Sequence, residues 1–429
     1  MNDADTQQYQ QALVKHLKQA NLLTNPLIEQ AFMKVPRHLF LPEEPLEKVY
    51  SDVAIVTKRG EEGRWTSSSS QPAIMAIMLE QLDLKPGQRV LEIGTGTGFN
   101  AALIASIVGP NGNVVTMDIQ PDLVEDARTC LDRAGYDWVQ TIVGDGGYGY
   151  PDGAPYDRII LTVGSDVITP AWREQLAPGG RLVLPFAVIG PQLSLAFEKQ
   201  DEELVSVESK PCGFMPLQGA FAVTLPVRTQ LGPDPRLLLL SNPGKELPVD
   251  ADIIYAWLRQ AGADRSTGVT VTRYELEWGL STWMGLQEMQ MKQQTALLAS
   301  LCAQGDLADQ NIIPALAGVG GEWKAMYSGV ILEADGMAAM MRQPGQPAPL
   351  IDLMHPDDNT PFELYVRRFG PGTAAEQYLL EYIQNWDRAG KLTSMNWKIR
   401  AIPAERDYQP TEGEFLVDKP WTKLIISYQ

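Results

Sequence analysis

The sequence predicts a doubly wound α/β sheet over about residues 73–225, preceded by helices and followed by a second, α+β domain. Short apolar runs alternate with helical periodicity between residues 89 and 185, as expected for parallel strands joined by crossover helices. A glycine-rich turn, residues 94–98, follows the first of these strands. The length of 429 residues also exceeds that of most single domains.

Helices and a loop are expected before the sheet begins at residue 89. Residues 7–35 carry an apolar stripe at helical spacing, with a new helix starting at Pro26 and ending near Pro36. Residues 58–70 have the composition of a loop, and residues 72–82 that of a helix with proline in its first turn. The alternation then predicts strands at 89–93, 113–118, 139–143, 158–162 and 181–185, and helices at 100–108, 122–134 and 171–176.

The pattern of alternating strands and helices ends after residue 225. Residues 231–235 have the composition of a connector, and the later segment 340–361 is rich in Pro, Asp and Gln. Thr373 and Glu376 have the spacing of a capping box, and the helix that they begin ends at Gly390. Short strands are expected at 397–402 and 423–428. We therefore expect a first domain at 1–225, with 1–72 as its lead-in, and a second domain at 226–429 that recognises the substrate.

Composition excludes several classes of partner. The net charge of −18 disfavours nucleic acid and anionic membrane surfaces, because both require a basic face. Three cysteines far apart indicate neither a disulfide framework nor a zinc site, and three histidines give no metal cluster. The polar, acidic N-terminus lacks the pattern of a signal peptide, and no apolar run is long enough to span a bilayer. A cytoplasmic protein is expected.

Acidic and glycine residues follow three successive predicted strands. Gly94-Thr95-Gly96-Thr97-Gly98 follows the first strand, Asp118 ends the second, and Gly144-Asp145-Gly146 follows the third. Glycines let the backbone approach a ligand, and the carboxylates can accept hydrogen bonds from ribose hydroxyls and an adenine amino group. Phe99 breaks the Gly-x-Gly-x-x-Gly spacing of dinucleotide folds, so S-adenosyl-L-methionine is the expected cofactor. The cofactor-binding candidates are Glu92, Gly94, Thr95, Gly96, Gly98, Asp118, Ile119, Gly144, Asp145 and Gly146.

The sequence resembles the protein-L-isoaspartate O-methyltransferases over about residues 10–220. The resemblance rests on Val35-Pro36-Arg37-His38-Leu39-Phe40, Ser70-Gln71-Pro72, the stretch 90–99, Gly144-Asp145-Gly146 and Phe214-Met215-Pro216-Leu217. It implies a Rossmann-like class I methyltransferase that esterifies the carboxylate of isoaspartyl residues in peptides. It also implies that Ser70 is the catalytic serine and that Ser68 replaces the family's threonine while keeping its hydroxyl.

The long C-terminal part also resembles a branch that modifies ribosomally made peptides, on the residues Trp386-Asp387-Arg388-Ala389-Gly390 and Ile399-Arg400-Ala401. That branch methylates an aspartate of one dedicated peptide, and the ester then collapses to an aspartimide or isoaspartate. General repair of aged proteins, a nicotinamide-dependent oxidoreductase and a non-catalytic peptide-binding module stay open as alternatives.

Two other groups of residues are interpreted as structural. His38 is expected to support the fold rather than act in acid–base chemistry. The tryptophans of the second half are expected to be core residues, because aromatic side chains dominate core burial: Trp257, Trp278, Trp283, Trp323, Trp386, Trp397 and Trp421.

Overall fold

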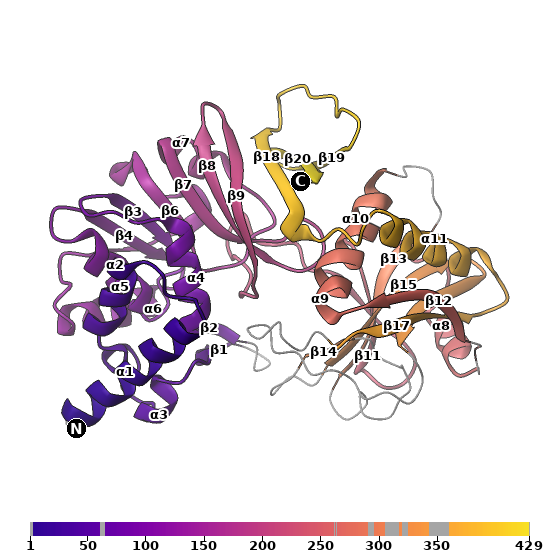
Figure 1. Cartoon of the computed structure of the whole chain (residues 1–429), viewed down its shortest axis with the longest axis horizontal. Helices are drawn as coiled ribbons and strands as arrows, with labels where there is room; N and C mark the ends of the chain where they lie inside the picture. The colour runs from indigo at the N-terminus through magenta and orange to yellow at the C-terminus, as the bar shows by residue number, and fades with distance from the viewer. Residues whose placement is uncertain are drawn as a thin grey trace. The chain divides into compact units, whose positions relative to one another are not determined.

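The computed structural model describes residues 3–60, 65–260, 262, 264–290, 296–304, 317–319, 325–342 and 360–428. The chain forms two compact units (Figure 1). The first comprises Met1–Val188, Gln192–Val223 and Lys398–Ser427, and the second Ile189–Pro191, Thr224–Trp397 and Tyr428–Gln429. Trp323, His355 and parts of the 58–70 and 340–361 segments lie outside the described residues.

A ten-stranded sheet forms the centre of the first unit, in the order β19-β20-β18-β9-β8-β7-β6-β3-β4-β5. The pairs β3–β4, β4–β5, β3–β6 and β6–β7 are parallel, which confirms the expected doubly wound sheet, whereas β7–β8 and β8–β9 are antiparallel. The elements of this unit before the second begins are α1 (Asp3–Gln19), α2 (Pro26–Lys34), η1 (Arg37–Phe40), α3 (Leu46–Val49), β1 (Ile55–Arg59), β2 (Trp65–Ser69), α4 (Pro72–Leu82), β3 (Arg89–Ile93), α5 (Phe99–Val108), β4 (Asn113–Asp118), α6 (Pro121–Arg133), β5 (Gln140–Val143), η3 (Gly146–Tyr148), η4 (Pro151–Gly153), β6 (Tyr156–Leu161), α7 (Pro170–Gln175), β7 (Leu176–Phe186), β8 (Leu193–Gln200) and β9 (Glu203–Pro211).

The core of this unit lies between the sheet and its helices. Strand β3 is buried along four of its five positions, and α5 is buried on nearly all sides, as its continuous apolar sequence requires. The lead-in helices cover α5: Phe32 of α2 meets Phe99 edge-on, with ring centroids 6.3 Å apart. The lead-in is therefore packed on the helix that follows the glycine turn.

The expected loop at 58–70 contains strands instead. Strands β1 and β2 form an antiparallel hairpin in which Ile55 pairs with Ser69 and Arg59 with Trp65. A run of serines has the composition of a linker, but here its backbone hydrogen bonds are supplied by a partner strand. The loop interpretation was therefore wrong for Trp65–Ser69.

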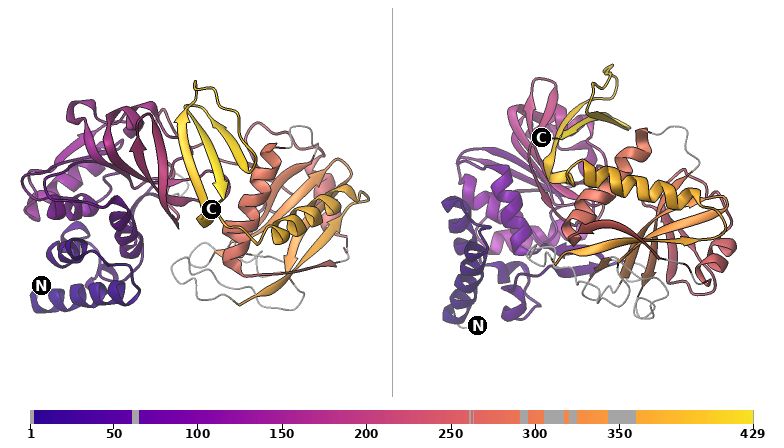
Figure 2. Two further views of the ribbon diagram at one scale, coloured as in Figure 1. Left: turned by 45° about the horizontal axis from the view of Figure 1, so that its top comes forward. Right: turned by 45° about the vertical axis from the view of Figure 1, so that its right-hand side comes forward.

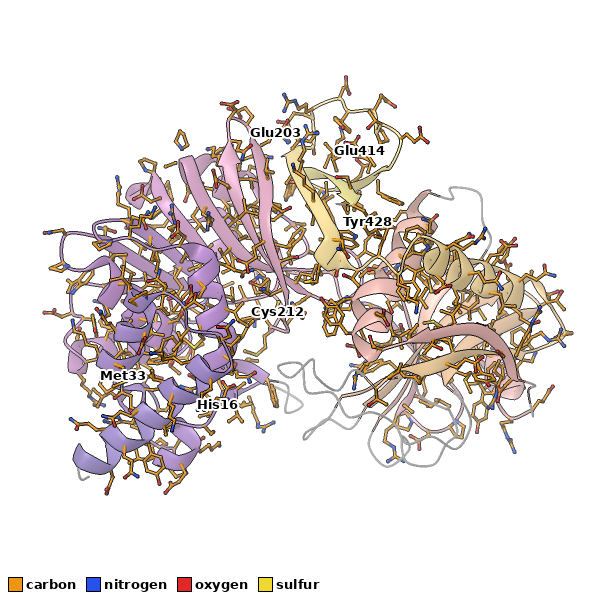
Figure 3. All side chains as sticks on the ribbon, viewed as in Figure 1. His16, Met33, Glu203, Cys212, Glu414 and Tyr428 are labelled. Carbon is orange, nitrogen blue, oxygen red and sulfur yellow. The ribbon has the colours of Figure 1, made fainter. Side chains whose placement is uncertain are left out.

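The last strands of the chain, β18 (Trp397–Pro403), β19 (Glu414–Lys419) and β20 (Thr422–Tyr428), extend the sheet of the first unit. Strand β18 pairs with β9, and the yellow strands of Figure 2 continue the magenta part of the sheet. Arg400 donates two hydrogen bonds, of 3.0 and 3.2 Å, to the carboxylate of Glu203, which Figure 3 labels beside β18. The expected second domain at 226–429 thus matches the second unit near its start but not at its end, because residues 398–427 return to the first unit.

An antiparallel sheet in the order β10-β11-β13-β15-β16-β17-β12, with β14 paired to β15, forms the second unit and confirms the expected α+β class. Alternate residues of β16 enter two different cores. Met337, Ala339 and Met341 pack on the side of α8, whereas Ala338 and Met340 pack on the side of α11. Its elements are β10 (Val227–Gln230), β11 (Leu237–Ser241), α8 (Ala251–Leu258), β12 (Asp264–Val271), α9 (Arg273–Glu275), the π-helix η5 (Leu276–Leu280), α10 (Ser281–Gln290), β13 (Leu297–Gln304), β14 (Ala317–Val319), β15 (Ala325–Glu333), β16 (Gly336–Arg342), β17 (Phe362–Phe369), α11 (Ala374–Arg388) and η7 (Ser394–Asn396).

Helix α11 follows the expected apolar face, but it lacks the expected capping box. Thr373 occupies the N-cap position and its side chain makes no capping hydrogen bond, while Glu376 lies 4.0 Å from Arg265. Gly390 has the positive φ, +86°, expected after a helix end.

Within the described residues, no helix combines the length and the apolar character that crossing a bilayer demands.

Candidate active site

The three sequence motifs converge at the carboxyl edge of the parallel strands. The strand order reverses between β3 and β6, which is where ligands of open α/β sheets bind. The Gly94 amide donates to the Met117 carbonyl at 2.8 Å, and the Gly144 amide donates to the Asp118 carbonyl at 2.9 Å. The segments after β3, β4 and β5 are therefore joined by backbone hydrogen bonds.

The glycines of the turn are required by backbone geometry and by close packing. Gly94, Gly96 and Gly98 have φ values of +104°, +51° and +84°, which L side chains rarely adopt. A β-carbon on Gly94 would lie 2.5 Å from the Thr162 hydroxyl oxygen, which donates to the Gly94 carbonyl at 2.6 Å. The turn is thereby fixed against the segment after β6.

Glu92 lies beneath this turn rather than at its surface. Its side chain is fully buried, and its carboxylate accepts hydrogen bonds from Asn100 Nδ2 at 2.7 Å and Thr116 Oγ1 at 2.6 Å. Thr95 is also buried, and its hydroxyl bonds that of Thr116 at 2.9 Å. The Glu92 and Thr95 side chains are thus hydrogen-bonded within the fold beneath the turn. That these two residues bind a cofactor stays a prediction.

Burial determines the electrostatics of the two carboxylates nearest the turn. Desolvation raises the pKa of Glu92 to about 7 and also raises the pKa of Asp118. Asp118 accepts from the Gly96 amide at 3.3 Å and the Gln120 amide at 3.1 Å, one on each oxygen. Each oxygen keeps a lone pair for a further donor, so Asp118 fits the role of a hydroxyl acceptor. Ile119 beside it is 37% exposed and offers an apolar surface.

Asp145 shapes the third motif. Its carboxylate accepts from the Gly147 amide at 2.9 Å and the Ala220 amide at 2.7 Å. Gly144 and Asp145 are half-buried, whereas Gly146 is buried and its carbonyl accepts from Trp172 Nε1 at 2.8 Å. The turn is therefore held by α7, through the Trp172 indole, and by the segment 219–221, through the Ala220 amide.

The four serines of residues 67–70, three of them in β2 and Ser70 just after it, alternate between buried and half-buried positions. Ser67 and Ser69 are buried and hydrogen-bonded, to Thr57 Oγ1 at 3.0 Å and Arg37 Nη2 at 3.3 Å. Ser68 and Ser70 alternate with them and are half-buried. A β-carbon placed on Gly96 would lie 3.5 Å from the Ser68 carbonyl oxygen. The structure therefore brings the serine strand against the glycine turn.

Arg37 and Asp52 fix the serine strand where it enters α4. The buried Arg37 donates to the carbonyls of Val49 at 2.8 Å and Ser70 at 3.0 Å. Asp52 accepts from the Ala73 amide at 2.8 Å and from Gln71 Nε2 at 3.2 Å, so it caps α4 from another segment. The sequence motif containing Arg37 was noticed, but the bonds it makes were not predicted.

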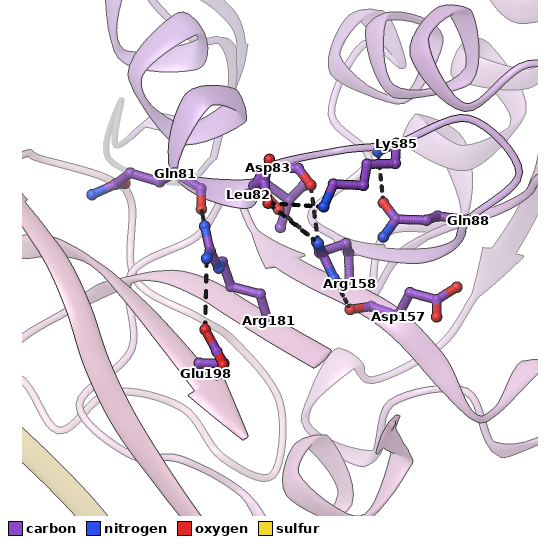
Figure 4. A network of polar contacts seen from close by, with 9 residues as sticks. All are labelled: Gln81, Leu82, Asp83, Lys85, Gln88, Asp157, Arg158, Arg181 and Glu198. Carbon is purple, nitrogen blue, oxygen red and sulfur yellow. Dashed lines mark hydrogen bonds and ion pairs between the residues drawn. The ribbon is translucent and has the colours of Figure 1, made fainter. Parts of the chain in front are cut away.

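Two arginines hold the opposite end of α4 (Figure 4). Arg158 donates to the Leu82 carbonyl at 2.6 Å and lies 3.7 Å from Asp83, which ends the helix with a φ of +50°. Arg181 donates to the Gln81 carbonyl at 2.9 Å and pairs with Glu198. Because α4 is anchored to β6 and β7 at its end, the serines before its start are held at a fixed height above the sheet.

Other sequence expectations can be placed on the same unit. Nδ1 of His38 lies 2.9 Å from the Tyr50 hydroxyl, in agreement with a structural role. The hairpin β1–β2 is also tied to the carboxyl edge of the parallel strands, because Gln120 Nε2 donates to the Thr66 carbonyl at 3.2 Å. Among the described residues, no group of three or more histidine, cysteine, aspartate or glutamate side chains is placed to hold a metal ion.

Comparison with known proteins shows which family the chain belongs to. Residues 7–221 match the family described as protein-L-isoaspartate(D-aspartate) O-methyltransferase. The chain belongs to this family. A protein-L-isoaspartate O-methyltransferase of Methanopyrus kandleri is 40% identical over 209 residues, which are 48% of this chain and 90% of that protein. A second one, of Archaeoglobus fulgidus, is 39% identical over 220 residues, which are 51% of this chain and 96% of that protein.

A solved structure of a protein-L-isoaspartate O-methyltransferase covers 91% of this chain and 96% of its own, with 24% identity and a TM-score of 0.49. Family membership confirms the class I methyltransferase fold, the enzyme class and the expected cofactor, S-adenosyl-L-methionine. The family match favours methyl transfer to isoaspartyl peptides over the oxidoreductase alternative. The residues after 221 lie outside the family match and form most of the second unit and the strands β18–β20.

Proposed function

We propose that this protein-L-isoaspartate O-methyltransferase acts on an aspartyl or isoaspartyl carboxylate of a dedicated peptide. The observation that carries the proposal is the approach of the Ser68 backbone to Gly96, which supports one site made of the serine strand and the glycine turn. In this proposal Gly94, Gly96, Gly98 and Gly144 give a ligand access to the backbone, Asp118 accepts from ribose hydroxyls, and Asp145 accepts from the adenine amino group. Gly146 supports the turn, and Ile119 contacts the base.

The chain's own groups mainly align the reactants. S-adenosyl-L-methionine supplies an electrophilic methyl group when bound. Ser68 and Ser70 donate hydrogen bonds to one oxygen of the substrate carboxylate and leave the other oxygen free to form the ester bond. The carboxylate loses its negative charge as the bond forms, so no strong general base is needed and alignment in a dry site supplies most of the acceleration. The ester can then close to a succinimide through the next backbone nitrogen without the enzyme.

The second unit supports a dedicated peptide rather than general repair. It carries its own two cores around an antiparallel sheet, and it lies outside the segment that the family shares. Repair of aged proteins needs recognition of only a few residues around the damage. We therefore assign substrate recognition to the second unit, with general repair as the alternative.

A substrate comparison tests this proposal. The full chain is assayed for transfer of labelled methyl from S-adenosylmethionine to an unstructured isoaspartyl peptide and to a precursor peptide encoded beside its gene. We expect a much higher kcat/KM for the precursor. Equal kcat/KM for unrelated isoaspartyl peptides, with none for the precursor, would establish repair instead, and inactivity on both substrates would overturn the methyltransferase proposal.

A further inference from the structure

Trp421 differs from the other tryptophans that were expected to be core residues. Trp257, Trp278, Trp386 and Trp397 are buried, as expected, whereas Trp421 is 40% exposed. It lies in the tight turn between β19 and β20, far along the chain from the family match that ends at residue 221. The core interpretation was therefore wrong for Trp421, and its exposure calls for another explanation.

An aromatic chain connects Trp421 to the Asp145 turn. The ring of Trp421 meets Phe221 edge-on, with centroids 5.9 Å apart, and Phe221 meets Tyr148 edge-on at 5.2 Å. The Phe221 ring also lies directly on Gly147, where an added β-carbon would come within 2.1 Å of it. Ala220, the residue before Phe221, donates its amide to Asp145. Trp421 thus packs against Phe221, which itself packs on this turn.

A second connection starts at the next residue of the hairpin. Thr422 is buried, and its hydroxyl donates to the Ile168 carbonyl at 2.9 Å. Ile168 precedes Thr169, which caps α7 by accepting from the Trp172 amide at 3.3 Å. The indole of Trp172 in turn donates to the Gly146 carbonyl. The hairpin therefore reaches both sides of the segment Asp145–Gly147.

Lys419 anchors the hairpin at the same edge of the sheet. Its ammonium donates to the Ala187 carbonyl at 3.2 Å and lies 5.9 Å from the centre of the Phe186 ring, where β7 ends. Strand β7 runs parallel to β6, so its end lies on the carboxyl edge that carries the three motifs. Lys419, Trp421 and Thr422 of the hairpin thus all make contacts at this edge.

We propose that the β19–β20 hairpin is part of the cofactor-binding edge, with Trp421 and Thr422 as positioning residues for the Asp145 turn. This inference rests on the proposed role of Asp145 in holding the adenine of S-adenosylmethionine. The hairpin braces a turn that begins with the half-buried Asp145. Gly146 and Gly147 follow it and have no side chains of their own to hold the turn in place. The C-terminal segment therefore contributes to cofactor affinity through the Asp145 turn, in addition to any role of the second unit toward the peptide.

Point variants of the full chain test this inference. We expect Trp421→Ala to raise the KM for S-adenosylmethionine and the Kd for S-adenosylhomocysteine by roughly 3- to 10-fold, the size of one edge-to-face aromatic contact. The kcat at saturating cofactor and the KM for the peptide should stay unchanged. Trp421→Phe should recover most of the affinity, because it keeps an aromatic edge. Thr422→Val should weaken cofactor binding through the second connection.

Trp138→Ala is the matched control, since Trp138 is 36% exposed but precedes β5, at the far end of that strand from Gly144. The inference is overturned if Trp421→Ala binds S-adenosylhomocysteine as tightly as Trp138→Ala does. It is also overturned if Trp421→Ala lowers kcat and the melting temperature while leaving the cofactor KM unchanged. A wild-type chain that does not bind S-adenosylhomocysteine at all would instead remove the proposed function and, with it, this inference.

Discussion

A single buried cation, Arg37, connects segments that are far apart in the sequence. Its guanidinium reaches the Val49 carbonyl, the Ser69 hydroxyl and the Ser70 carbonyl, and it lies 5.7 Å from the centre of the Phe99 ring. Burial lowers the pKa of Arg37 to about 10, so the side chain stays protonated near neutral pH. The Val-Pro-Arg motif is thus explained by a role in positioning the serine strand on α5.

Glu92 also acts through another element, because it accepts its hydrogen bonds from Asn100 and Thr116 inside the fold. The sequence predicted Glu92 at the cofactor, because a Leu-Glu pair before a Gly-x-Gly-x-Gly turn is typical of adenosylmethionine sites. Periodicity cannot tell whether the side chain of a strand-end residue points into the core or into the site. The burial of the Glu92 and Thr95 side chains could therefore not be predicted from the sequence.

The raised pKa of Glu92 gives a pH-dependent stability. Between the ordinary pKa of 4.5 and the folded value of about 7, the folded chain holds a proton that the unfolded chain has released. The contribution of Glu92 to stability therefore falls as the pH rises through this window and is constant above it. We expect Glu92→Gln to be more stable relative to the wild type at about pH 8 than at about pH 5, by on the order of 2 to 3 kcal/mol.

Urea unfolding at the two pH values measures this difference. The glutamine can be accommodated, because the Thr116 and Thr95 hydroxyls can exchange donor and acceptor roles. An equal change in the free energy of unfolding at both pH values would show that Glu92 is ionised throughout this range.

At the scale of elements, the strand β2 shows what composition conceals. The serine run has weak strand propensity, and its strand conformation depends on pairing with β1 and on Arg37, neither of which a local pattern reveals. The parallel strands β3 to β6 were predicted closely, since apolar runs bounded by glycine and proline are local signals, whereas β8 and β9 were not predicted. The capping box at Thr373 failed because Glu376 lies near Arg265 of another strand.

The alternation along residues 67–70 leads to opposite outcomes for the two serine pairs. Ser68→Ala with Ser70→Ala should lower kcat by roughly 10-fold or more per hydroxyl, because each loses a hydrogen bond that aligns the carboxylate with the methyl group. Ser67→Ala with Ser69→Ala should mainly lower the free energy of unfolding, by about 1 kcal/mol per hydrogen bond. Steady-state kinetics and urea unfolding of both double variants test this. A larger loss of kcat in the Ser67/Ser69 variant would contradict the proposed roles.

At the scale of the whole molecule, the C-terminal strands were predicted but their partners were not. The strand-like run at 423–428 predicts a strand, yet nothing local indicates that β18 pairs with β9. The Ile399 amide donates to the Ser206 hydroxyl at 2.8 Å across a separation of 193 residues. The sequence therefore predicted a single domain boundary near residue 225, whereas the chain leaves the first unit there and returns to it at residue 398.

The central claim is that one site joins the glycine turn, the strand-end carboxylates and the serine face of β2. A crystal structure of the full chain with S-adenosylhomocysteine tests it most directly. We expect the ribose hydroxyls at about 3 Å from the Asp118 carboxylate, the adenine amino group at a similar distance from Asp145, and the sulfur facing Ser68 and Ser70. A ligand bound away from this edge, or bound with its sulfur turned from the serine strand, would contradict the claim.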